Sequence, residues 1–366
     1  MKNRQTALKE KYDVVIVGSG PAGASTAMAL SGQGLRTLIL EKKKLPRHKM
    51  CSGMLFPSAL RFIADNFGDI PQNIWCQPLS VKGVRSYMDM DSPFVETAFS
   101  RGNRGTDGIS VKRAGLDKWL CGRSDAALVD RCSFRGCMKQ GDEILLRVAM
   151  NGHEFEVRTN YLVGADGTLS RVRRTLFPGF DRGLGLFLNY EEWFVGKIDL
   201  EPGWLHAFYD ERLTGCFGGV FQKDSRIIVT NGCSQQEPVK KYFYAFCGYL
   251  EERHSLVIDE TVASYGCVVH DMPATDNFLT GKENVLLVGE AGGFNRCAEG
   301  ITSALITGKA AGESILKSIQ TGENASEIYL VAAKQEIERC KRAYGFMEKS
   351  LGINPFTRSS NSLSGS

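Results

Sequence analysis

The sequence lacks the features that mark several large classes of protein. It holds 11 cysteines but no C-x-x-C, and its five histidines do not join them at zinc-site spacing, so we expect reduced thiols and no metal. No apolar run approaches the ~20 residues that span a bilayer, and the polar start MKNRQTALKEK has no signal-peptide core. The net charge is only +4 and no dense Lys/Arg tract occurs, so no nucleic-acid partner is expected. These absences predict a cytoplasmic protein, with peripheral membrane contact left open.

The composition suits a large globular core. The 366 residues exceed the ~100–200 of a typical domain, and 43% of them are hydrophobic. The 40 glycines are more than average usage, which indicates many tight or closely approached backbone positions. We expect one large domain or two interleaved ones.

The stretch YDVVIVGSGPAGASTAMAL reads as a buried parallel strand, a glycine turn and a small-residue helix, and LRTLILE reads as the second strand. Gly18, Gly20 and Gly23 form G-x-G-x-x-G, which allows a tight turn, the approach of a pyrophosphate and close helix–strand packing. Glu41, about 20 residues further on, can accept hydrogen bonds from an adenosine ribose and disfavours the 2′-phosphate of NADP. A glycine turn without a ligand is the alternative. The predicted dinucleotide site comprises Gly18, Gly20, Pro21, Ala22, Gly23, Glu41 and Lys42.

Two further strands end in a glycine–acid pair. LVGADGTLSRVRR places Asp166 and Gly167 after one strand, and LLVGEAGG places Gly289 and Glu290 after another. Each alone is also compatible with a surface turn. A dinucleotide that binds across a parallel sheet lies at the carboxyl ends of its strands, so these acids are expected to accept from sugar or ribitol hydroxyls.

The remaining patterns predict further elements. VKRAGLDKWL predicts a helix that begins near Arg113, and residues 143–167 read as three strands, the first two joined by an Asn-Gly turn. Residues 181–270 look strand-rich, with a hairpin in GCFGGVFQKDSRIIVTNGC. Helices are expected from EGITSALITGKAAGESIL onward, and the polar end RSSNSLSGS predicts disorder.

In this order, the three motifs resemble a class of FAD-dependent oxidoreductases. The class includes aromatic hydroxylases of the p-hydroxybenzoate hydroxylase type, flavin halogenases and geranylgeranyl reductases. VKRAGLDKWL is similar to the class's R-x-x-x-D-x-x-L pattern, which implies that Arg113 contacts FAD and that Asp117 supports the helix. In CAEGI, the amides of Gly300 and Ile301 would face a negatively charged edge of the isoalloxazine ring. The resemblance covers roughly residues 12–315.

One loop favours the geranylgeranyl reductase family within that class. PRHKMCSG resembles the family's P-R-x-K-x-C-G-G loop, matched at Pro46, Arg47, Lys49, Cys51 and Gly53. The resemblance implies that Arg47, Met50, Cys51 and Ser52 lie at the FAD. Cys51 is then a candidate acid or substrate contact, with a small packed thiol as the alternative.

The sequence also departs from the family. Position 290 is Glu where Asp is usual, and Arg296 replaces a proline. Arg296 would place a cation near the flavin, where it would stabilise an anionic reduced ring or an acidic substrate; an outward-pointing arginine is the alternative.

The aromatic pattern of the predicted substrate region is only partly kept. The family's prenyl-contacting P-x-x-Y-x-W-x-F-P has its best counterpart in TGCFGGVFQ, where Gly219 stands in place of Trp. Losing that indole removes a large apolar wall, which puts a lipid substrate in doubt. In GWLHAFYDE, alternating residues are candidate pocket wall or core, and His206 is a candidate acid–base group. The predicted substrate contacts are Trp204, Phe208, Phe217 and Phe221.

The leading prediction is a reductase that transfers hydride from reduced flavin to a carbon–carbon double bond of an isoprenoid-like or other apolar substrate. The alternatives are an FAD-dependent monooxygenase, a halogenase, which the missing W-x-W-x-I-P pattern disfavours, and a non-enzymatic flavin-binding or redox-sensing protein. No second nucleotide-binding βαβ unit is visible, so NAD(P)H would use a shared or surface site, or an electron-carrier protein would reduce the flavin.

The resemblance implies an α/β fold with a Rossmann-type FAD-binding domain, a β-sheet substrate domain and C-terminal helices. We expect the FAD-binding domain to comprise residues 1–75, 109–180 and 273–318. The substrate domain would comprise 76–108 and 181–272. Residues 319–366 would form a C-terminal helical region and a disordered tail.

Overall fold

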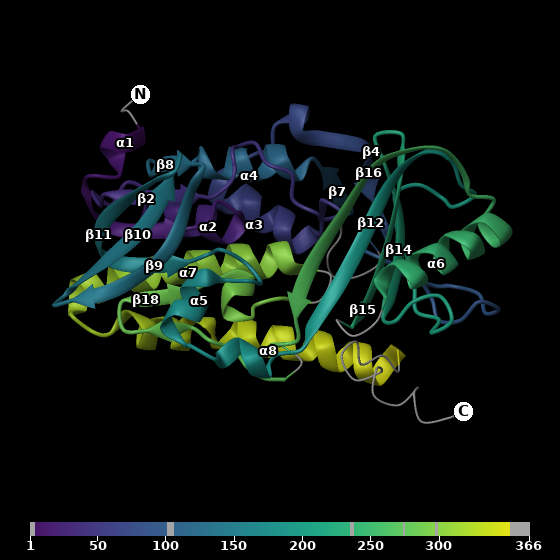
Figure 1. Ribbon diagram of the computed structural model, residues 1–366. Coiled ribbons are helices and arrows are strands. Elements are labelled where there is room, and N and C mark those ends of the chain that lie inside the picture. The colour runs from purple at the N-terminus through teal and green to yellow at the C-terminus, as the bar shows by residue number, and fades with distance from the viewer. Residues whose placement is uncertain (1–3, 101–105, 235–237, 274, 297–298, 352–366) are drawn as a thin grey trace.

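The computed structural model describes residues 4–100, 106–234, 238–273, 275–296 and 299–351 (Figure 1). The predicted disordered end of the chain lies outside these residues. The expected α/β fold is confirmed: a mostly parallel sheet with helices stands beside a second, mostly antiparallel sheet (Figure 1). Among the described residues, no helix is long and apolar enough to cross a membrane.

The first sheet has eight strands, with β17-β18-β11-β1-β2-β8 as its main path. β10 pairs antiparallel with the first part of β11, and β9 pairs antiparallel with β10. β1 and β2 are rich in β-branched and aliphatic residues and almost fully buried, as expected of parallel strands covered on both faces. The strands are β1 (Lys11–Val17), β2 (Thr37–Glu41), β8 (Ala127–Asp130), β9 (Cys132–Gln140), β10 (Glu143–Met150), β11 (His153–Gly164), β17 (Gly281–Lys282) and β18 (Val285–Leu287).

The prediction of three strands over residues 143–167 is wrong, because β11 is one continuous strand of 12 residues. It pairs antiparallel with β10 along its first part and parallel with β1 and β18 further on, so a change of partner looked like a strand boundary. The predicted turn before it is confirmed: Asn151 and Gly152 both have positive φ, 54° and 81°, as a two-residue hairpin loop requires.

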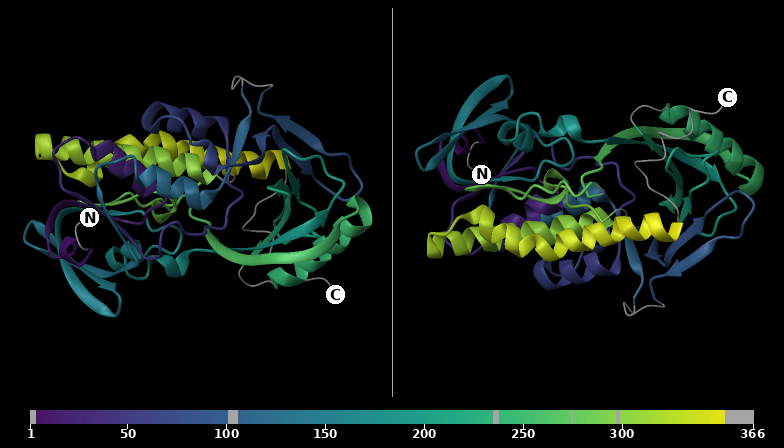
Figure 2. Two further views of the ribbon diagram at one scale, coloured as in Figure 1. Left: turned by 90° about the horizontal axis from the view of Figure 1, so that it is seen from above. Right: turned by 90° about the horizontal axis from the view of Figure 1, so that it is seen from below.

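Helices cover the first sheet. α2 (Pro21–Leu30) packs against α7 (Gly300–Thr321), which in turn packs against α8 (Ala325–Leu351); Figure 2 shows α8 running along this side of the molecule. Gly308 and Gly312 let α7 approach α2. A Cβ on Gly308 would lie 2.2 Å from the Ala22 carbonyl oxygen, and one on Gly312 would lie 2.7 Å from the Ala29 Cβ. The shorter helices are α1 (Arg4–Ala7), α3 (Pro57–Phe67), α4 (Arg113–Cys121), α5 (Arg171–Leu176), η1 (Gln72–Ile74), η2 (Phe180–Gly183) and η3 (Gly289–Gly292). The predicted helix start at Arg113 is thus confirmed.

The second sheet has seven strands in the order β16-β12-β15-β14-β13-β5-β6. Its strands are β5 (Gly83–Tyr87), β6 (Val95–Ala98), β12 (Leu186–Lys197), β13 (Trp204–Phe208), β14 (Phe217–Lys223), β15 (Arg226–Ser234) and β16 (Val257–His270). The predicted hairpin is confirmed as β14–β15. A small sheet of β3 (Met54–Leu55), β4 (Trp75–Val81) and β7 (Gly108–Val111) completes the fold.

One helix was missed in the region predicted to be strand-rich. α6 (Val239–His254) covers one face of the seven-stranded sheet through a side that includes Phe243, Phe246 and Leu250 (Figure 1). The opposite face of that sheet is turned toward the first sheet. The domain boundaries stated above remain a prediction, although both large sheets draw strands from separate stretches of the chain.

Candidate functional site

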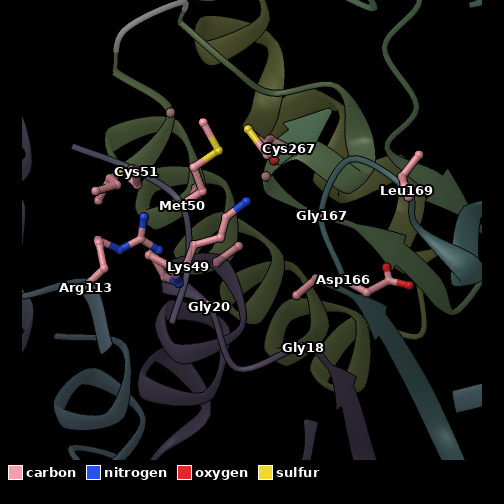
Figure 3. A pocket seen from close by; sticks show the side chains of 18 of the residues that line it. Gly18, Gly20, Lys49, Met50, Cys51, Arg113, Asp166, Gly167, Leu169 and Cys267 are labelled. Carbon is pink, nitrogen blue, oxygen red and sulfur yellow. The ribbon is translucent and has the colours of Figure 1, made fainter. Parts of the chain in front are cut away.

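A cavity of about 850 Å³ lies where the carboxyl ends of β1, β2, β11 and β18 meet the face of the seven-stranded sheet opposite α6. That volume is within the ~300–1,000 Å³ range of ligand and cofactor pockets. The structure brings to it every predicted cofactor residue except Gly23, namely Gly18, Gly20, Pro21, Ala22, Glu41, Lys42, Arg47, Met50, Cys51, Ser52, Arg113, Asp166, Gly167, Gly289, Glu290, Gly300 and Ile301. Figure 3 labels several of them, from both ends of the cavity.

The glycine turn after β1 has the shape that a pyrophosphate site needs. Gly18 has φ +114°, and a Cβ on it would lie 2.3 Å from the Ala165 carbonyl oxygen, so no side chain fits. A Cβ on Gly20 would meet only the tip of Arg47, at 3.7 Å, so the backbone there is open to a ligand. Gly23 instead packs α2 on β1, since its Cβ would lie 2.0 Å from the Gly18 carbonyl oxygen. The first-turn amides of α2 supply donors for an anion, so these residues fit the phosphates of a dinucleotide.

A chain of buried charges runs beside this turn. Arg47 donates from Nε to Glu41 Oε2 at 3.0 Å, and its Nη1 lies 3.1 Å from Asp117 Oδ2. Asp117, fully buried, also accepts two hydrogen bonds from Arg113, at 3.1 and 3.2 Å. Burial alone would raise the pKa of Glu41, but Arg47 and the Ser19 hydroxyl outweigh it and hold that pKa below its ordinary value. Glu41 is therefore an ionised acceptor at neutral pH.

The two glycine–acid turns lie side by side. Glu290 accepts a hydrogen bond from the Thr168 hydroxyl at 2.8 Å, which joins the turn after β18 to the turn after β11. Asp166 faces the first turn of α5, where it accepts from the Ser170 hydroxyl at 2.6 Å and the Arg171 amide at 2.7 Å. Burial raises the pKa of Asp166 against these hydrogen bonds. Asp166 thus shapes its turn by capping α5, and Glu290 is the acid with fewer partners.

The loop that carries Cys51 forms another wall. Figure 3 shows the Arg113 guanidinium beside Cys51, close enough for the two side chains to interact electrostatically. Asp166, Gly167 and Leu169 lie on the right of Figure 3, and Cys51 and Arg113 lie on the left. The cavity therefore extends from the acid turns to the cysteine loop.

The seven-stranded sheet supplies lining residues that the sequence reasoning missed. Asn189 of β12 and Tyr265 and Cys267 of β16 face the cavity, and His48 of the cysteine loop stacks on Tyr265 with ring centres 3.7 Å apart. Burial, followed by neighbouring cations, lowers the pKa of His48. No local motif marks these residues; only the strand register places them on one face.

Two predicted catalytic residues lie elsewhere. Arg296 donates to Glu336 of α8 at 2.6 Å, which ties the loop after η3 to the C-terminal helix instead of aiming a cation into the cavity. His206 is buried on β13, with Nδ1 3.1 Å from the Tyr87 hydroxyl and Nε2 2.9 Å from the Glu201 carbonyl oxygen. Burial lowers the pKa of His206 to about 4, so it is neutral at pH 7.

The predicted substrate contacts are not lining residues either. Trp204 and Phe208 share a face of β13 with His206, and Phe208 packs against Phe246 of α6 at 5.0 Å, so this face is core. Phe221 is also buried. A Cβ on Gly219 would lie 2.8 Å from the Phe217 ring, so that ring occupies the space beside the glycine that stands where the reductase pattern has tryptophan.

Comparison with known proteins identifies the cofactor that this cavity binds as FAD. Residues 11–63 match the family described as FAD binding domain. Protein CbrA of Escherichia coli K12 is 29% identical over 313 residues, which cover 81% of this chain and 82% of that protein. A geranylgeranyl bacteriochlorophyll reductase-like protein from Thermoplasma acidophilum has a TM-score of 0.79 at 19% identity, covering 95% of this chain and 90% of its own.

A myxobacterial chondrochloren halogenase, CndH, has a TM-score of 0.69 at 17% identity, covering 93% of this chain and 82% of its own. At these identities the structural likenesses establish the fold, which reductase-like and halogenase proteins share. The match over residues 11–63 makes the chain a flavoprotein, and its fold is the one that this reductase-like protein and this halogenase share.

Proposed function

We propose that this protein is an FAD-dependent reductase that adds hydrogen across a carbon–carbon double bond of an isoprenoid-like or other apolar substrate. The observation that supports it is the position of Cys51, which lines the same cavity as the glycine turn and Glu290. The TM-score of 0.79 with the reductase-like protein, against 0.69 with the halogenase, favours the same class.

The residues divide the work between binding and proton transfer. Reduced FAD, when bound, supplies a hydride to one alkene carbon. Cys51 holds a proton at Sγ and gives it to the other carbon, so the π bond is replaced by two C–H bonds. The thiolate left behind is stabilised by the Arg113 guanidinium and regains its proton from solvent.

The wall where the loop of Cys51 meets β16 orients the substrate and excludes water. There the stacked pair of His48 and Tyr265 offers a flat aromatic surface. Burial raises the pKa of Cys267 to about 12, so this second thiol stays neutral and acts as apolar surface rather than as an acid.

Anaerobic photoreduction of the holoenzyme tests the reaction. Adding an isoprenoid alkene without oxygen should restore the absorbance of oxidised flavin and yield a product two hydrogens heavier. Cys51→Ser should keep FAD bound and lose about 100-fold or more in turnover, the usual contribution of a positioned acid. Cys137→Ser, at a half-buried cysteine of β9 away from the cavity, is the matched control. Flavin that is reoxidised only by oxygen would exclude the reductase, and unchanged turnover in Cys51→Ser would make Cys51 a packing residue.

The second candidate function is a monooxygenase, that is a hydroxylase or epoxidase, or a halogenase. It is favoured by the polar Asn189, which lines the cavity and suits a smaller aromatic or polyketide-like substrate better than a prenyl chain. Product formation that requires oxygen would support it.

As the reductant of the flavin we propose NAD(P)H at a surface site or an electron-carrier protein. An isoprenoid substrate would in addition bring the enzyme into peripheral contact with a membrane.

A further inference from the structure

A buried lysine at the end of β14 has no part in the chemistry described so far. Lys223 is 5% exposed, and its Nζ donates hydrogen bonds to the Ser52 carbonyl at 3.1 Å and the Val111 carbonyl at 2.7 Å. Ser52 belongs to the cysteine loop and Val111 ends β7, so both acceptors lie outside the seven-stranded sheet. One side chain of the substrate sheet therefore reaches the segment next to Cys51.

This lysine is buried without a direct ion pair. Among the described residues no carboxylate pairs with its ammonium group, and burial lowers its pKa against the weaker, opposing effect of the nearby Asp224. An ammonium group that loses its hydration is costly unless other dipoles replace the water, and here two carbonyl oxygens do so. A methionine of similar length would fill the same space without that cost. The charge is therefore explained by the carbonyls it binds rather than by packing.

The backbone at Ser52 and Gly53, which Lys223 binds, is tightly packed against Val111. Gly53 has φ +69°, and a Cβ on it would lie 2.3 Å from the Val111 carbonyl oxygen and 2.6 Å from Lys223 Nζ. The Gly53 carbonyl in turn accepts from the Val111 amide at 2.9 Å. Two residues after Val111 comes Arg113, whose guanidinium lies beside Cys51 (Figure 3). Lys223 thus binds the backbone next to Cys51, at Ser52, and the backbone two residues before Arg113, at Val111.

The hairpin tip is docked independently of this lysine. The Asp224 amide donates to the Gln77 carbonyl at 2.6 Å, and the Gln77 amide donates to Asp224 Oδ1 at 2.8 Å. Replacing the Lys223 side chain therefore leaves the hairpin attached to β4 and removes only the two bonds to the cysteine loop and β7.

We propose that Lys223 is a positioning residue for Cys51. Its ammonium group, supplied by the sheet that faces the substrate, fixes the backbone at Ser52 and Gly53 and with it the direction in which the thiol meets the cavity. This inference deepens the proposed function: its turnover test rests on that function, and its structural test does not.

Amide hydrogen exchange of the FAD-loaded protein tests the structural part. Lys223→Met should speed exchange at least tenfold in peptides that cover residues 51–55 and 108–112, and Lys223→Arg, which keeps a cation, should restore most of the protection. The matched control is Lys112→Met, an exposed lysine 3.7 Å from Asp224 at the same hairpin tip, which should leave exchange in the peptide of residues 51–55 unchanged. Unchanged exchange in Lys223→Met would overturn the proposal. Should that variant not accumulate as holoenzyme, Lys223→Gln gives the same comparison with a shorter donor.

Turnover on the alkene separates positioning from a general loss of structure. Lys223→Met should lower kcat at least tenfold with little change in KM, and should have no further effect in a Cys51→Ser background. An equal loss in both backgrounds would overturn action through Cys51. If the wild-type protein reduces no alkene, the proposed function fails, and the exchange experiment still decides whether Lys223 holds the loop.

Discussion

The placement of His206 predicts a pH-dependent loss of stability rather than a role in catalysis. Its Nε2 faces a backbone carbonyl, which only accepts, so Nε2 carries the proton and Nδ1 accepts from Tyr87. That arrangement fits the neutral ring, and burial lowers the pKa of His206 from the ordinary 6.5 to about 4. In the unfolded chain the ring takes up a proton near pH 6.5, so the unfolded state binds more protons between pH 6.5 and 4.

The size of the effect follows from these two values. Each tenfold change in proton affinity is worth about 1.4 kcal/mol, so the difference between 6.5 and about 4 amounts to about 3 kcal/mol. Because the folded pKa is the lower one, this stability is fully present above about pH 6.5 and is lost as the pH falls toward 4. Urea unfolding at pH 7.5 and pH 4.0 should show wild type losing about 3 kcal/mol more than His206→Gln over that interval.

Two controls make the measurement specific. His153→Gln, at an exposed position at the start of β11, should follow the wild-type pH dependence. His206→Gln should also keep the wild-type rate of flavin turnover, because the residue faces α6 and not the cavity. Parallel pH dependences of wild type and His206→Gln, or loss of turnover in that variant, would refute the assignment of His206 to the core.

Two further predictions concern the cofactor end of the cavity. Asp117→Asn should cost about 3–5 kcal/mol in urea unfolding, because it leaves Arg47 and Arg113 buried with one partner fewer, whereas Glu201→Gln at an exposed ion pair should cost under about 1 kcal/mol; equal losses would contradict the buried network. Gly18→Ala should abolish FAD retention in gel filtration, since its Cβ would lie 2.3 Å from the Ala165 carbonyl oxygen, while Gly248→Ala, with nothing within 4 Å, should retain it; FAD retained by Gly18→Ala would show that the turn can move.

The parts of the fold that depend on neighbours in the chain could be predicted from the sequence. The turn at Gly18, the helix start at Arg113 and the β14–β15 hairpin all follow from local patterns. The errors arose where distant segments decide. α6 was missed because its aromatic residues resembled strand residues, and without it the face of β13 that it covers looked like a pocket wall. Arg296 was aimed at the flavin because its partner, Glu336, lies 40 positions away on another helix.

The difference between features set by local sequence and features set by distant segments also affects how well the reaction can be predicted. The FAD end of the cavity is built from turns at strand ends, where local geometry dictates glycine or an acid, so it carries motifs that can be recognised in the sequence. The other end of the cavity is lined by residues of β12 and β16 together with His48, and the stacked His48 and Tyr265 are brought together only by folding. Such a wall leaves no signature in the sequence, because any side chain of suitable size satisfies a strand position. Cys51 and Lys223 connect the two ends, one by its place in the loop and the other by its bonds to that loop. Chemistry that differs among proteins of this fold is therefore expected to depend on this junction rather than on the glycine turn.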